Sequence, residues 1–270
     1  MKKRSIGMLV VMGILATMGW AHFQMILPSE SFFEDGRATT ISLQLIFTHP
    51  GGASHGADDD PLTMNMSRPD HFFVVNRGNI IDLTDQLLEY TFEHGSRKAQ
   101  AWKTDYRIRG MGDFVFALSP APYYEEREDI FITQHSKVIL NSMGFPSDWS
   151  EPVGTEAEIL PLTWPFNLYP GSLFTGRVLF QGEPVADAEI EVEYVNTDAF
   201  KGAFAGHYGR SFPGGESPAM LVVSDENGYF HFSFPWAGWW GFVALMEGEE
   251  IDGVEHEVGG AFFVRVDNLP

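Results

Sequence analysis

The chain has no cysteine among its 270 residues. This absence excludes disulfide bridges, thiolate zinc sites, thiol catalysis and a lipid anchor on an N-terminal cysteine. Basic residues are also scarce, with 17 Lys and Arg against 37 Asp and Glu and a formal net charge of −20 at pH 7. Such a chain repels nucleic acid and anionic membranes and attracts cations. We therefore expect no nucleic-acid partner.

Long apolar runs are missing after the first 20 residues. The one run near the start extends from Ile6 to Met18, follows Lys2, Lys3 and Arg4, and precedes Gly19-Trp20-Ala21. It is shorter than the ~20 residues that span a bilayer, and its flanks are typical of a cleavable signal peptide. The sequence therefore predicts a signal peptide over 1–21, export to the periplasm and no stable membrane insertion.

Cleavage after Ala21 would make His22 the first residue of the mature protein. A free amine and an imidazole on one residue can chelate a transition metal such as copper or nickel, because both donors are neutral nitrogens of intermediate softness. The simpler interpretation is a signal peptide whose next residue happens to be histidine.

Strand patterns dominate the rest of the sequence. Residues Ile41 to Phe47 alternate between apolar and polar, and residues 188–195 place Ile190, Val192 and Tyr194 on one face and glutamates on the other. The pair Asn227-Gly228 favours a tight hairpin. With 44% hydrophobic residues, the chain can build a substantial core. We predict an all-β fold with two β-sandwich-like domains, and one short helix between Asp82 and Tyr90.

The expected domain division follows composition. Residues 22–150 form an N-terminal β domain with a metal site, and 151–171, rich in proline, form a linker. Residues 172–270 hold about seven short strands with turn signals between them, a spacing typical of an immunoglobulin-like sandwich.

A polar cluster lies between two of the expected strands. It holds three histidines, several carboxylates and two thioethers, namely His49, His55, Asp58, Asp59, Asp60, Met64, Met66, Asp70 and His71. Imidazole suits nickel, cobalt, copper and zinc, and a thioether adds preference for reduced copper. We predict His22, His49, His55 and His71 as metal ligands. The alternative is an acidic loop with incidental histidines.

Within this cluster, His49 ends the alternating strand and precedes Pro50. Together with the amine and imidazole of His22, it would complete a three-nitrogen brace. By itself, His49 is equally consistent with a strand-end histidine bonded to backbone.

No enzymatic template fits the sequence, which has no nucleophile elbow, no phosphate-binding glycine loop and no helical His-Glu-x-x-His. His231 alternates with phenylalanines and is expected to face solvent. The tryptophans at 236, 239 and 240 are expected to pack in a core or at the seam between domains. We expect a protein that is not an enzyme.

Several segments resemble one known family. They are Ala21 to Ser29, Phe47 to Pro50, Pro120 to Glu125, Glu158 to Leu162, Gly182 to Val185, Glu191 to Tyr194, Asp225 to Phe230 and Ala237 to Trp240. Together they resemble the periplasmic components associated with cobalt and nickel ABC-type uptake systems, long catalogued as a domain of unknown function. The resemblance implies export, a C-terminal sandwich like the B-type repeats of collagen adhesins, and a role in nickel or cobalt handling. It places the metal-binding histidines at His22 and His49, although Gly51-Gly52 replaces the usual bulky residue after His-Pro.

The function expected from these observations is a periplasmic accessory protein that binds Ni²⁺ or Co²⁺ and delivers it to the membrane components of an uptake transporter. Copper is a further possible ion. The alternatives are a non-catalytic periplasmic interaction protein without a metal role and, further off, a copper-binding protein or histidine-brace oxygenase.

Overall fold

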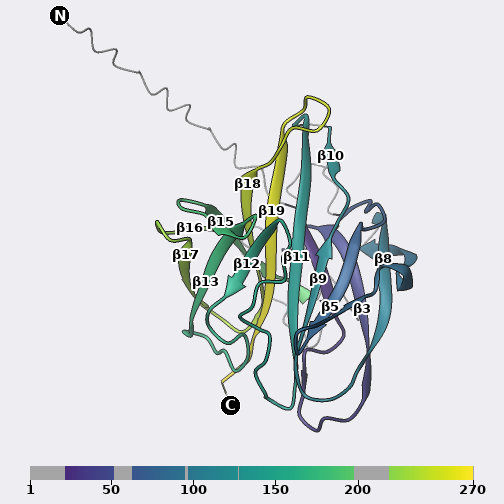
Figure 1. The fold of residues 1–270 in the computed structure, drawn as a ribbon, viewed down its shortest axis with the longest axis vertical. Coiled ribbons are helices and arrows are strands. Elements are labelled where there is room, and N and C mark those ends of the chain that lie inside the picture. Colours follow the sequence, from purple (N-terminus) through teal and green to yellow (C-terminus); the bar gives the residue numbers. More distant parts are fainter. Residues whose placement is uncertain (1–21, 52–62, 95–96, 127, 198–218, 270) are drawn as a thin grey trace, which may run out of the picture.

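The computed structural model describes residues 22–51, 63–94, 97–126, 128–197 and 219–269. These residues form three β-sheets (Figure 1). The prediction of an all-β, sandwich-like fold is confirmed. The predicted signal peptide, 1–21, lies outside the described residues.

Sheet A is built from the N-terminal half of the chain. Its order is β1 (Phe23–Pro28), β3 (Thr39–Thr48), β8 (Arg97–Ile108) and β7 (Leu88–His94), and the short β4 (Thr63–Met64) also pairs with β3. As the alternation predicted, Ile41, Leu43 and Leu45 are buried.

Sheet B runs through both halves of the chain. Its order is β16 (Met220–Val223), β15 (Glu189–Val195), β18 (Gly238–Glu247), β19 (His256–Val266), β11 (Ile130–Ser142), β9 (Gly112–Ser119), β5 (His71–Asn76) and β6 (Asn79–Asp82). Two short strands, β2 (Phe32–Phe33) and β10 (Tyr123–Glu125), also pair with β11. The parallel pair of β11 and β19 joins the two halves expected from the sequence in one sheet.

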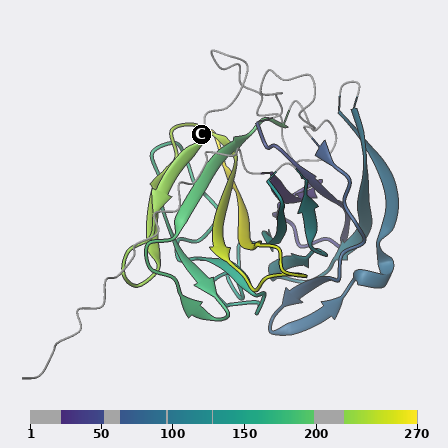
Figure 2. The same cartoon turned by 90° about the horizontal axis from the view of Figure 1, so that it is seen from above.

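Sheet C contains β12 (Ala157–Pro161), β13 (Leu173–Phe180) and β14 (Glu183–Pro184), and β17 (Tyr229–Ser233) pairs with β13. Seen from above, sheets A and C lie on either side of the strands of sheet B (Figure 2). The segment 151–171, which we expected to be a linker, contains the buried strand β12 of this sheet.

Two hydrophobic cores separate the three sheets, and adjacent residues of sheet B enter different cores. Trp239 and Phe263 pack with Phe23 and Phe72 of the N-terminal half, whereas Trp240 and Phe262 pack with the strands of sheet C. This follows from the pleat of a strand, which turns successive side chains to opposite faces. The expectation that the tryptophans at 239 and 240 are buried is confirmed.

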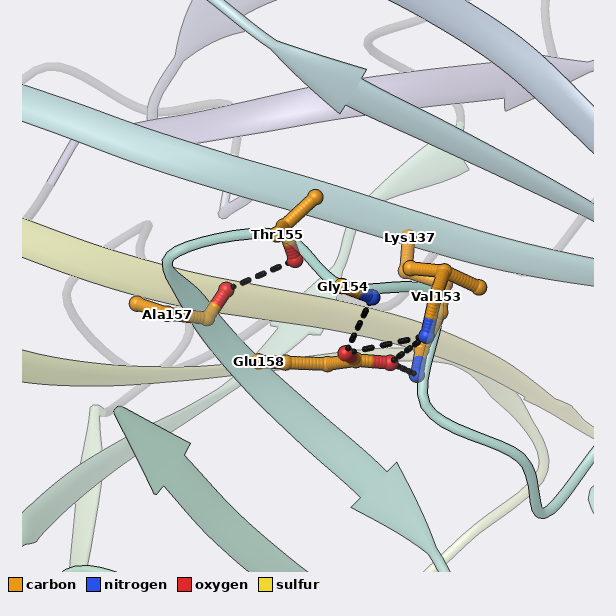
Figure 3. Close-up of polar contacts among 6 residues, drawn as sticks. All are labelled: Lys137, Val153, Gly154, Thr155, Ala157 and Glu158. Carbon is orange, nitrogen blue, oxygen red and sulfur yellow. Dashed lines mark hydrogen bonds and ion pairs between the residues drawn. The ribbon is translucent and has the colours of Figure 1, made fainter. Parts of the chain in front are cut away.

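Sheet C is held to sheet B by a buried ion pair (Figure 3). The ammonium of Lys137 on β11 donates to the carboxylate of Glu158 on β12 over 2.5 Å, and both side chains are about 4% exposed or less. The backbone N–H groups of Val153 and Gly154 donate to the same carboxylate. Burial lowers the pKa of Lys137, and the Glu158 carboxylate opposes that shift.

Two local predictions are wrong. In place of the helix expected over 82–90, the structure has a single 3-10 turn, η1 (Thr84–Gln86), followed by β7. The apolar spacing of Leu83 and Leu87 resembles a helix, but both side chains enter the core around this turn. Glu193, expected to face solvent with the other glutamates of β15, is 3% exposed, because the N-terminal half covers this end of the strand.

Candidate metal centre

The antiparallel pairing of β1 and β3 brings His22 and His49 together. Phe23 is opposite Thr48 in the register, so the residue before β1 and the residue after β3 lie at the same end of the pair. The ring centroids of His22 and His49 are 4.1 Å apart and the rings are tilted by 43°. His49 is 3% exposed, whereas His22 is half-buried. The two histidines singled out in the sequence therefore lie in contact.

Two aromatic side chains and one methionine sulfur border this histidine pair. The ring of Phe47 is 5.5 Å from the ring of His22 and 5.4 Å from that of Tyr123, measured between centroids. The hydroxyl of Tyr123 donates a weak hydrogen bond of 3.6 Å to the sulfur of Met64. Burial raises the pKa of Tyr123, and Glu125 adds to the shift, so this phenol stays neutral at physiological pH.

Gln24 anchors the strand that carries His22. Its backbone N–H donates to Oε1 of Gln134 on β11 over 3.0 Å, and its side-chain amide donates to the carbonyl of Ile46 over 2.9 Å. The same amide donates to the sulfur of Met66 over 3.4 Å. These bonds satisfy a polar side chain inside an otherwise apolar strand, and they fix the start of β1 two residues from His22.

The C-terminal half supports the other side of the pair. The backbone N–H of Asn196 donates to the carbonyl of Pro50, directly after His49, over 2.9 Å. Asn196 follows β15, whose last residue, Val195, belongs to the core between sheets A and B. Both halves of the chain therefore hold the segment that ends in His49.

The remaining predicted ligands do not join this pair in the described part of the chain. His55 lies outside the described residues. His71 begins β5, is exposed, and is opposite Ser119 of β9. Within the described ranges, no three His, Asp or Glu side chains lie close enough to form a ready-made metal site. The pair of His22 and His49 is thus a partial donor set, which a free amine or another donor type would have to complete.

Other histidines have structural partners. His231 is exposed on β17, as expected, and its Nδ1 lies 2.9 Å from the hydroxyl of Thr175. The Nε2 atom of His256 lies 2.9 Å from the hydroxyl of Thr133 on β11. These contacts connect strands within a sheet and give neither residue a role at the centre described above.

The space beside the centre is small. A cavity of about 20 Å³ lies next to Phe47 and Tyr123 and is also lined by Gln24, Met66 and Gln134. Such a volume holds about one water molecule and is far below the ~300 Å³ typical of small-molecule sites. Among the described residues, this cavity is lined by Phe47 and Tyr123 but by neither histidine, and it has no room for an organic substrate.

Comparison with known proteins places the chain in a family. Residues 19–248 match the family described as "Domain of unknown function (DUF4198)", and the chain belongs to it. No curated protein matches the chain. In the part of the chain that the structure describes, no helix is long and apolar enough to cross a membrane.

Two solved structures show distant likeness. A mutant of Salmonella alpha-2-macroglobulin is 12% identical, with a TM-score of 0.24, and the match covers 90% of this chain but only 15% of that one. The D00-D0 domain of intimin is 14% identical, with a TM-score of 0.19, over 86% of this chain and 94% of that chain.

Proposed function

We propose that the protein is a periplasmic metal-binding protein that holds Ni²⁺ or Co²⁺ at His22 and His49 and passes the ion to membrane components of an uptake transporter. The observation that carries this proposal is the contact between the two imidazoles, 4.1 Å apart between centroids. Neutral imidazole nitrogens are good donors for both ions.

Processing after Ala21 would supply the third donor. The new α-amine belongs to the same residue as the His22 imidazole, so amine and ring can chelate one ion while His49 closes the set. Three nitrogen donors leave further coordination positions for a partner's ligand. A partner that takes over one donor position would loosen the ion, because the set would then be left with two nitrogen donors.

The two donor residues differ in their support, and this fits binding followed by release. His49 is buried and flanked by Pro50, whose carbonyl is bonded to Asn196. His22 is less buried and precedes the first strand residue. The ion would therefore rest on one fixed imidazole and one terminal chelate, and nothing in this role requires catalysis.

Isothermal titration of Ni²⁺ and Co²⁺ into protein that begins at His22 tests the proposal. We expect one ion per chain, a large loss of affinity in His22→Ala and His49→Ala, and a similar loss when one extra residue precedes His22. His231→Ala, which alters an exposed strand histidine, serves as the matched control and should bind normally. Unchanged binding in the extended protein or in His22→Ala would reject the chelate.

A further inference from the structure

Met64 lies on β4, which pairs with the end of β3 that leads into His49. In the register of β3 and β4, Met64 is opposite Phe47, so the two side chains share a face of the sheet. His49 comes two residues after Phe47 and directly follows the last residue of β3, Thr48. Met64 and His49 are therefore separated by one cross-strand pairing and two residues of chain, a separation that long side chains can bridge.

The sulfur of Met64 is buried but only weakly engaged. The residue is 7% exposed, and its sulfur accepts a 3.6 Å hydrogen bond from the Tyr123 hydroxyl. A thioether is a weak acceptor, and methionine has three rotatable side-chain bonds. The sulfur can therefore leave the phenol for a metal ion without leaving a buried charge behind.

Met66, two residues further on, has a different role. Its sulfur accepts from the amide of Gln24, and its backbone N–H donates to the carbonyl of Gln100. These contacts tie Met66 into the support of β1. The chain thus offers two buried thioethers close in sequence, one beside the histidine pair and one engaged in structure.

We propose that Met64 supplies a thioether to an ion held by the imidazoles of His22 and His49, so that this pair also binds Cu(I). The proposal rests on the proposed function, because it uses the same two histidines. Two imidazoles and one thioether are neutral, and thioethers select Cu(I) among the ions that imidazole binds. A buried site with neutral donors also favours a singly charged ion over a divalent one, since charge in a poorly hydrated site is costly.

The two ions would use different third donors. Ni²⁺ takes the α-amine of His22, whereas Cu(I) takes the sulfur of Met64 and needs no amine. An extra residue before His22 should therefore abolish tight Ni²⁺ binding and leave Cu(I) binding intact. Met64→Leu should do the opposite, because leucine keeps the apolar volume and removes only the sulfur.

Anaerobic competition between the protein and a chromogenic Cu(I) chelator, with ascorbate as reductant, tests the proposal. We expect Met64→Leu to raise the Kd for Cu(I) by at least about 10-fold and to leave the Kd for Ni²⁺ unchanged. Met246→Leu, which alters a methionine packed against the core between sheets B and C, is the matched control and should change neither. X-ray absorption at the copper edge should show a sulfur neighbour in the wild type that is missing in Met64→Leu.

The outcomes separate this inference from the proposed function. The proposed Met64 ligand is overturned if wild type and Met64→Leu bind Cu(I) equally well, or if the copper spectrum shows nitrogen neighbours alone. Either result leaves the Ni²⁺ results with His22→Ala unaffected. Copper binding that depends on Met64 in a protein that ignores Ni²⁺ and Co²⁺ would instead support the thioether and reject nickel or cobalt as the cargo.

Discussion

The imidazole rings of His22 and His49 lie in contact because β1 and β3 pair antiparallel, which brings the residue before one strand to the residue after the other. The backbone pairing of the two strands therefore positions both rings. Two imidazoles this close favour a shared ion when both are neutral, and they repel each other when both carry a proton.

This relationship predicts that Ni²⁺ affinity falls in acid. The α-amine and imidazole must give up their protons to coordinate a metal, and such groups take up protons between about pH 6 and 8. We expect the Kd for Ni²⁺ to rise at least about 100-fold between pH 7.5 and 5.5. Titration calorimetry at the two pH values measures this, with circular dichroism to verify that the fold persists. Equal affinity at both values would mean that the ion does not use these nitrogens.

The Lys137–Glu158 pair predicts a strong asymmetry between single and double substitutions. Glu158→Gln leaves the buried ammonium of Lys137 without its carboxylate, which should destabilise the fold by about 3–5 kcal/mol. Lys137→Met combined with Glu158→Gln removes both charges and retains an acceptor for the N–H groups of Val153 and Gly154. We therefore expect the double variant to be more stable than Glu158→Gln alone.

Urea denaturation followed by tryptophan fluorescence measures both variants. Lys98→Met serves as the control, because the Lys98–Glu93 pair is exposed and should contribute no more than about 1 kcal/mol. A double variant as unstable as Glu158→Gln would show that the packing of β12, and not the uncompensated charge, governs stability here.

His135 predicts how stability depends on pH. The residue is 8% exposed, its Nδ1 lies 3.0 Å from the hydroxyl of Ser119, and its Nε2 has no hydrogen-bond partner among the described residues. Burial lowers the pKa of His135 below the usual 6.5, against an opposing pull from Glu156. The unfolded chain therefore takes up this proton first, and stability should fall as the pH falls through about 6.5.

Replacement of His135 by Gln should flatten that dependence between pH 7.5 and 5.5. The measurement is the free energy of unfolding in urea at several pH values across this range. His231→Gln, at an exposed site on β17, should keep the slope of the wild type. A slope that is the same in His135→Gln and the wild type would assign the acid sensitivity to other groups.

The sequence patterns predicted the strands well where one face is apolar. Ile41, Leu43 and Leu45 are buried, as their alternation indicated. Apolar residues at every second position are typical of a half-buried strand and not of a helix. The helix predicted over residues 82–90 is absent because long-range contacts override a helix-like local pattern. Leu83 and Leu87 are spaced as in a helix, but the N–H of Leu83 donates to Phe72, and the backbone becomes extended at Leu87. Contacts with β5 outweigh the local pattern.

Half of the candidate site was accessible from the sequence. His22 was recognisable as the residue after the predicted cleavage site and His49 as the end of a strand pattern, and the structure brings them together. The roles of Gln24 and Tyr123 could not be predicted from the sequence. They depend on the register of β1 against β3 and on the pairing of β10 with β11. The pairing register of strands that are distant in the sequence is not visible in any local sequence pattern. A single glutamine within an apolar strand was the one available clue.

The final prediction concerns Gly260 on β19, where the backbones of sheets B and C approach closely. A Cβ atom at this position on β19 would lie 2.8 Å from the backbone nitrogen of Glu158 and 3.0 Å from the carbonyl carbon of Ala157. Both atoms belong to β12, whose backbone cannot rotate away as a side chain could. We expect Gly260→Ala to lower the free energy of unfolding by about 1–3 kcal/mol, the usual cost of overpacking. Ser233→Ala, exposed on β17, should stay close to wild type in the same urea titration. A stable Gly260→Ala protein would mean that β12 can shift outward while its contacts with β11 persist.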